Sequence, residues 1–146
     1  MAHITFIDTE IDPKDGSIRD LGAINEDGGI FHKNSIHRFV DFLKGTSFIC
    51  GHNILNHDIK YLNRYLNEAG LSHLQIIDTL YLSPLLFPKR PYHHLLKDEK
   101  LQIDELNNPV NDSIKAKDLF FDEINAFTNL EDPIKQIFFS LLRDRK

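Results

Sequence analysis

The order of the apolar segments along the chain is the feature that most limits its possible folds. Three stretches rich in β-forming residues come first, at 3–7, 18–24 and 30–32, and turn-forming residues separate them. Strand-like and helix-like stretches then alternate. Three strands joined by short turns predict an antiparallel meander, whereas the alternation predicts parallel strands joined by helices. Together they predict an α/β fold, a mixed sheet with helices on its faces.

The alternating part contains the remaining strands and the helices. In chain order we predict a helix capped by Ser35 and closed by Gly45, a strand over 47–50, a helix from Asn56 or His57 to Ala69, a strand over 75–77 and a helix capped by Asp78 and Thr79. An irregular loop is predicted at Pro84, Pro88 and Pro91. Two further helices are predicted, one from Asn111 or Asp112 to Phe127 and one with Pro133 in its first turn.

Composition limits the size and class of the protein. The chain has 146 residues, 41% hydrophobic and 27% charged, as expected for one globular domain spanning 1–146. Its 17 basic and 22 acidic residues give a net charge of −5, which excludes a strongly basic nucleic-acid-binding protein. The single cysteine, Cys50, cannot form an internal disulfide. No apolar run approaches the ~20 residues of a membrane span, so we expect a soluble intracellular (cytoplasmic) protein without membrane contact.

Acidic residues occur at the ends of several predicted elements. Asp8 and Glu10 lie at the end of the first strand, two residues apart, so both point to the same side of it. Asp58 and Asp112 lie at predicted helix starts, where helix capping alone would also explain a carboxylate. Four carboxylates meeting at one point would repel unless cations lay between them. Such oxygen ligands suit Mg²⁺ or Mn²⁺, and two ions about 3.5–4 Å apart form a site for phosphoryl transfer.

The segments around these carboxylates resemble the motifs of the DEDD exonucleases, the DnaQ-like 3′–5′ exonuclease family with a ribonuclease-H-like fold. Phe-Ile-Asp-Thr-Glu at 6–10 resembles the first motif. Phe-Ile-Cys-Gly-His-Asn at 48–53, followed by His-Asp-Ile-Lys-Tyr-Leu at 57–62, resembles the second. Ile-Ile-Asp-Thr-Leu at 76–80 and the segment 111–120 resemble the strand and helix that lead to the last aspartate. The motifs occur in family order and cover most of the chain.

The resemblance implies a catalytic site on these residues. The ligands of two Mg²⁺ or Mn²⁺ ions would be Asp8, Glu10, Asp58 and Asp112. Thr9 and Ile11 would contact the terminal nucleotide through backbone and apolar contacts. Asn53 would line the site, although it could equally tie down its own loop.

One position departs from the family pattern. The histidine-bearing (DEDDh) branch has a general base five positions before the last aspartate, where this chain has Asn107. An amide can orient a water molecule but cannot take its proton near neutral pH. His93 and His94 lie upstream as candidate replacements, and a pair of histidines at a helix start is the alternative interpretation. Slow activity and no activity are therefore both open.

The predicted function is a metal-dependent 3′–5′ exonuclease that releases nucleoside monophosphates from a single-stranded or frayed DNA or RNA 3′ end. Such domains commonly belong to a larger chain or complex with a polymerase or helicase, so this one could be an excised domain. One alternative is an inactive module of the same fold that binds 3′ ends or a protein partner. Another is a metal-free interaction domain whose acidic residues are helix caps.

Overall fold

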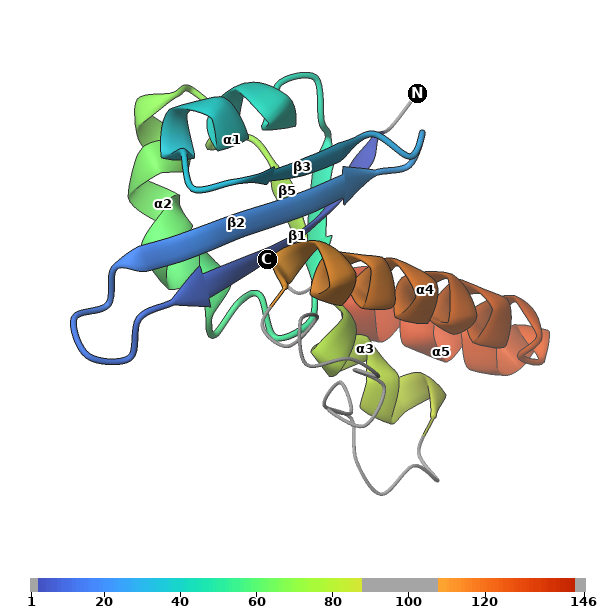
Figure 1. Cartoon of the computed structure of the whole chain (residues 1–146). Coiled ribbons are helices and arrows are strands. Elements are labelled where there is room, and N and C mark those ends of the chain that lie inside the picture. Colours follow the sequence, from blue (N-terminus) through green and yellow to red (C-terminus); the bar gives the residue numbers. More distant parts are fainter. Residues whose placement is uncertain (1–2, 88–107, 144–146) are drawn as a thin grey trace.

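The computed structural model describes residues 3–87 and 108–143, which form a five-stranded mixed sheet flanked by helices (Figure 1). The elements follow one another as β1-β2-β3-α1-β4-α2-β5-α3-α4-α5. This is the order predicted from the sequence. No helix in the described ranges is both long enough and apolar enough to cross a membrane.

The sheet combines an antiparallel and a parallel half. Its strands are β1 Ile4–Ile11, β2 Ile18–Asn25, β3 Ile30–Lys33, β4 Phe48–Gly51 and β5 Gln75–Asp78. They lie in the order β3-β2-β1-β4-β5, so β1 is central. β1 pairs with β2 and β2 with β3 in antiparallel fashion, whereas β1 with β4 and β4 with β5 are parallel. The predicted mixed sheet is therefore confirmed.

The helices lie on both sides of this sheet, with α1 and α2 on one side and α3 and α4 on the other (Figure 1). Their bounds are α1 Ile36–Leu43, α2 Asp58–Glu68, α3 Thr79–Leu86, α4 Pro109–Thr128 and α5 Asp132–Arg143. The predicted cap of α1 is present, because Ser35 Oγ accepts a hydrogen bond from the Arg38 N–H at 3.5 Å.

Two local predictions differ from the structure. Helix α4 begins at Pro109, because Asn108 Oδ1 accepts from the Val110 N–H at 2.9 Å and proline suits the first helical position. Asp112 therefore lies in the first turn of the helix, three residues after its first residue, instead of opening it. Pro84 lies inside α3, so the loop predicted there is wrong. A proline this near the end of a short helix removes one backbone hydrogen bond, and α3 ends two residues later. The other two prolines of that prediction, Pro88 and Pro91, lie outside the described residues.

The two faces of the sheet carry cores of very different size. The larger core lies under α1 and α2 and consists of the buried residues Ile7, Leu21, Ala23, Phe31, Phe39, Val40, Leu43, Ile49, Ile54, Leu62, Leu66, Leu71 and Leu74. The smaller core lies under α4 and consists of the buried residues Phe6, Ile24, Cys50 and Phe120. The apolar cluster under α4 is therefore much smaller than the core under α1 and α2, and polar groups share this face of the sheet with it.

Candidate functional site

Strand β1 sends alternate side chains to opposite faces of the sheet. Phe6 belongs to the core under α4 and Ile7 to the core under α1 and α2. The two-residue period of a strand therefore directs Asp8 and Glu10 toward α4 and Thr9 toward α1 and α2. The predicted strand already implied that Asp8 and Glu10 share one face of the sheet, and the structure places them on that face.

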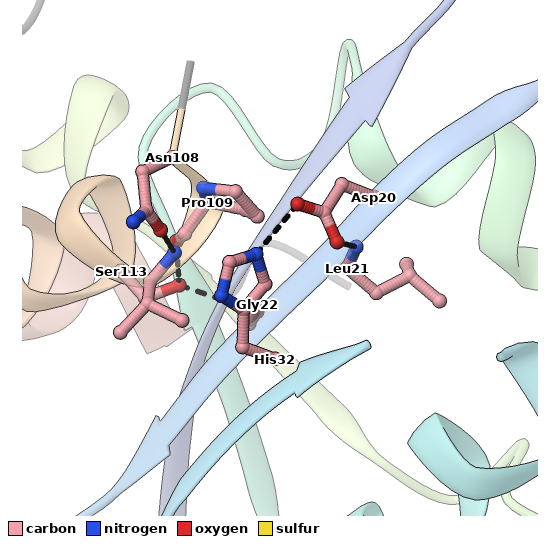
Figure 2. Close-up of polar contacts among 8 residues, drawn as sticks. Asp20, Leu21, Gly22, His32, Asn108, Pro109 and Ser113 are labelled. Carbon is pink, nitrogen blue, oxygen red and sulfur yellow. Dashed lines mark hydrogen bonds and ion pairs between the residues drawn. The ribbon is translucent and has the colours of Figure 1, made fainter. Parts of the chain in front are cut away.

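The first turn of α4 packs directly on β2. A Cβ atom on Gly22 would lie 2.4 Å from the carbonyl carbon of Pro109, so only glycine fits there. Ser113 Oγ, which is buried, contacts the Gly22 carbonyl oxygen at 3.3 Å and the Pro109 carbonyl oxygen at 2.7 Å (Figure 2). Because Gly22 pairs with Asp8 across the strands, this seating brings the start of α4 beside the acidic part of β1.

Three carboxylates meet where α4 begins. Asp8, Glu10 and Asp112 each offer one carboxylate oxygen, and these oxygens all lie within 4.8 Å of one another. All three residues are half-buried, which limits the screening of their mutual repulsion by water. Hard divalent cations such as Mg²⁺ and Mn²⁺ prefer oxygen ligands of this kind. The chemistry of these donors fits a divalent cation, and three of the four carboxylates predicted from the sequence are brought together.

The fourth predicted ligand, Asp58, lies outside this group of three. It is 1% exposed, and its Oδ1 accepts hydrogen bonds from the Thr9 N–H at 2.7 Å and from Thr9 Oγ1 at 2.6 Å. The pairing of β1 with β4 stops at Phe6 and Cys50, before it reaches Thr9. Asp58 therefore supplies the acceptor that a longer β4 would have supplied, and it holds the acidic part of β1 in place.

Burial changes the acidity of Asp58. Desolvation raises the pKa of this carboxyl from 3.8 to about 6, against the opposing effects of the Thr9 hydrogen bonds and the nearby His57. The carboxylate still predominates at neutral pH. Its contact with Thr9 engages both the N–H and the hydroxyl of that buried residue, and the predicted contact of Thr9 with a nucleotide stays a prediction.

The loop after β4 is held by Asp78, which the sequence predicted only as a helix cap. That cap is present, because Asp78 Oδ1 accepts from the Leu80 N–H at 2.9 Å. The same carboxylate also accepts from the N–H groups of Asn53 at 2.8 Å and Leu55 at 3.0 Å. Asn53 has a φ of 61°, a left-handed conformation that asparagine tolerates. Its Oδ1 accepts from Asn56 Nδ2 at 3.2 Å, so the described contacts of Asn53 tie down the loop.

Other predicted residues receive less support. Ile11 is half-buried at the end of β1, where the pairing with β2 shifts register, and its contact with a nucleotide stays a prediction. Asn107, at the position of the family's general base, lies outside the described residues. The same holds for His93 and His94.

Two polar residues on the face of the acidic group were missed by the sequence analysis. Asp20 on β2 pairs directly with Glu10, and His32 on β3 pairs with Gly22. Their side chains are joined by a contact of 2.6 Å between Asp20 Oδ2 and His32 Nε2 (Figure 2). The proximity of Asp20 and His32 to Glu10 follows from the register of three strands. No short sequence motif indicates that register.

Comparison of the chain with protein-family models and with curated proteins found no match. Its function is therefore inferred from the geometry of the site and from the motifs described above.

Proposed function

We propose that the protein is a metal-dependent 3′–5′ exonuclease acting on the 3′ end of single-stranded or frayed DNA or RNA. One observation carries the proposal: carboxylate oxygens of Asp8, Glu10 and Asp112 lie within 4.8 Å of one another, although the residues come from opposite ends of the chain. Bringing three like charges together costs free energy in the absence of a cation. A divalent cation would offset that cost, which makes a metal site the most economical reason for the arrangement.

The fold supports the same proposal. The sheet has the strand order β3-β2-β1-β4-β5, with an antiparallel half and a parallel half joined at β1. This arrangement is compatible with a ribonuclease-H-like domain, in which the central strand carries acidic residues. The motif at 6–10 lies on β1, and the segment 111–120 lies on α4. The positions of these elements therefore agree with what the resemblance to DEDD exonucleases implies.

In the proposed reaction, some residues of the chain would bind the cation and others would hold those residues in position. Asp8, Glu10 and Asp112 would hold the cation, and Asp58 would keep β1 in place through Thr9. When bound, Mg²⁺ or Mn²⁺ would stabilise negative charge on the scissile phosphate, and two such ions would stabilise both the attacking and the leaving oxygen. The second ion is expected from the resemblance and would draw on Asp58. The products would be a nucleoside monophosphate and a strand shortened by one nucleotide.

Metal binding is tested first, because it also separates the proposal from a metal-free interaction domain. We expect millimolar Mn²⁺ or Mg²⁺ to raise the Tm of the wild-type protein, since a ligand that binds only the folded state stabilises it. Asp112→Asn should abolish this shift. Asp118→Asn is the matched control, because Asp118 is an exposed aspartate on the same helix. An unchanged Tm with both metals would contradict the metal site.

Activity is tested on 5′-labelled single-stranded DNA and RNA of the same sequence, with each metal in turn. We expect a ladder of products that shorten from the 3′ end, and no ladder with Asp8→Asn. Comparing the two substrates identifies the preferred nucleic acid. Intact substrate under every condition, together with metal-dependent binding of the 3′ end, would replace the exonuclease by a module that binds 3′ ends.

A further inference from the structure

A second polar cluster lies beside the three carboxylates. In β2, Asp20 pairs with Glu10 and Gly22 pairs with Asp8, and in β3, His32 pairs with Gly22. Directly paired residues of antiparallel strands point to the same face, with Cβ atoms about 4.5–5.5 Å apart. The side chains of Asp20 and His32 therefore lie on the face that carries the acidic group, next to the first turn of α4 (Figure 2).

The hydrogen bonds of this pair fix the orientation of the imidazole ring. Asp20 Oδ1 accepts from the Leu21 N–H at 3.0 Å, and Asp20 Oδ2 lies 2.6 Å from His32 Nε2. A carboxylate can only accept a hydrogen bond, so Nε2 of the neutral ring must carry the proton. The lone pair of the imidazole is then on Nδ1. The side chains of His32 and Asp20 are 42% and 31% exposed, so water reaches the pair.

The pair is poorly explained as a stabilising contact. A contact between side chains as exposed as these contributes little to stability whether the ring is neutral or charged, because water competes for the hydrogen bond and screens any charge. Its arrangement is, however, that of a proton acceptor: an imidazole whose tautomer and orientation are set by a carboxylate. Hydrolysis of a phosphodiester is faster when such an acceptor takes the proton of the attacking water. Carboxylates that bind a cation are poorly suited to this role, because their lone pairs are engaged by the cation.

We propose that His32, oriented by Asp20, accepts the proton of the attacking water. The inference rests on the proposed function. In this step the water oxygen bonds to phosphorus while its proton moves to His32 Nδ1. The bond from phosphorus to the 3′ oxygen of the preceding nucleotide breaks, and that oxygen keeps the electron pair and takes a proton from solvent. His32 then returns its proton to solvent, so the protein is unchanged after each turnover.

The test compares single-turnover rates of His32→Ala, Asp20→Asn and the wild type on the single-stranded substrate with Mn²⁺. His37→Ala is the matched control, because His37 is an exposed histidine on α1, on the other side of the sheet. General-base catalysis is worth roughly 10²–10⁴-fold, so we expect His32→Ala to lose about 10²-fold or more. Asp20→Asn should lose less, and the control should keep the wild-type rate.

Free imidazole distinguishes a proton acceptor from a structural residue. Added imidazole should restore part of the His32→Ala rate and should leave Asp8→Asn inactive. The shift of Tm by Mn²⁺ should be the same in His32→Ala and in the wild type. A His32→Ala rate within twofold of the wild type, or a loss that imidazole does not restore, would overturn the inference while leaving the exonuclease intact. A wild-type protein without activity would instead overturn the exonuclease, and this inference with it.

Discussion

The two faces of the sheet differ in what they are made of. Under α1 and α2, buried apolar side chains from four strands and both helices form a continuous core. Under α4 the buried apolar cluster is smaller, and the same face of the sheet also carries carboxylates, a serine and a histidine. Free energy of folding can thus come from one face while the other accommodates groups that repel one another. A chain of this size thus keeps its main apolar core and its clustered carboxylates on opposite faces of a single sheet.

The two faces are separated by single residue steps along β1. We call the face under α1 and α2 the closed face and the face under α4 the open face. Ile7 and Thr9 belong to the closed face, whereas Asp8 and Glu10 belong to the open face. A shift of one residue in register would exchange the two sets. The pairing of β1 with both β2 and β4 prevents this, because it fixes the strand from both sides.

The largest expected effect concerns the closed face. Phe39 is fully buried and packs edge-on against Phe31, so Phe39→Ala should lower the free energy of unfolding by about 3–5 kcal/mol through lost burial and a cavity. Urea unfolding measures this loss. The variant should unfold at a lower temperature than the wild type. Mn²⁺ should nevertheless raise its Tm by as much as it raises the Tm of the wild type.

Phe121→Ala on the open face is the counterpart of this variant. Phe121 is 41% exposed, so its truncation should cost clearly less than that of Phe39. Equal losses in the two variants, or a Phe39→Ala protein that is folded but no longer responds to Mn²⁺, would show that the faces are not separate in function.

Gly22→Ala tests the seating of α4 on the open face. The added methyl group would lie 2.4 Å from the Pro109 carbonyl carbon, so α4 must move, at a cost of about 1–3 kcal/mol. Because that movement carries Asp112 away from Asp8, the Mn²⁺ shift in Tm should also be lost. In Gly29→Ala the closest atom belongs to the end of the Asn25 side chain, and this variant should keep the Mn²⁺ shift. A Gly22→Ala protein with a normal Mn²⁺ shift would contradict the seating.

The pH dependence of stability tests Asp58, which links the faces through Thr9. Folding raises the pKa of this carboxyl from 3.8 to about 6, so its favourable contribution is present at low pH and is lost as pH rises through about 6. The side-chain amide introduced by Asp58→Asn does not titrate in this range. Between pH 4.5 and 7.5, without metal, the wild type should therefore lose about 2 kcal/mol relative to Asp58→Asn. Urea unfolding at both pH values measures this difference.

A second variant at this position isolates the hydrogen bonds. Asp58→Asn keeps a carbonyl oxygen that can accept from Thr9, whereas Asp58→Ala leaves the buried N–H of Thr9 without that acceptor. Asp58→Ala should therefore be less stable than Asp58→Asn at both pH values. Parallel pH curves for the wild type and Asp58→Asn would rule out the raised pKa.

The smallest expected effect is at the edge of the closed face. Ser35 caps α1 through a long hydrogen bond of 3.5 Å to the Arg38 N–H, so Ser35→Ala should cost only about 0.5–1 kcal/mol. Thermal unfolding should detect this change, and the response to Mn²⁺ should not change. A loss as large as that of Phe39→Ala would mean that α1 depends on its cap more than on its buried side chains.

The order of the elements was predictable because its signals are local. Apolar periodicity, capping residues such as Ser35, and turn residues act over a few positions, so each element is indicated by its own segment of the sequence. Pro84 was misjudged because proline disfavours a helix interior in general, whereas α3 is short enough to contain it.

The candidate site was predictable only in part. The motif resemblance pointed to Asp8, Glu10 and Asp112, and the structure brings them together. The contact of Asp58 with Thr9 could not be predicted, because it depends on where β4 stops beside β1. The Asp20–His32 pair likewise depends on the register of three strands, which a single sequence does not specify.

The seating of α4 on Gly22 has a consequence for the order of events during folding. Asp8 and Glu10 are made early in synthesis, but the group of three is incomplete until the helix that carries Asp112 has docked. A nascent or partly folded chain in which α4 has not docked therefore has no complete acidic group. Any cation that binds the group stabilises the docked state, so cation binding and the docking of α4 are thermodynamically coupled.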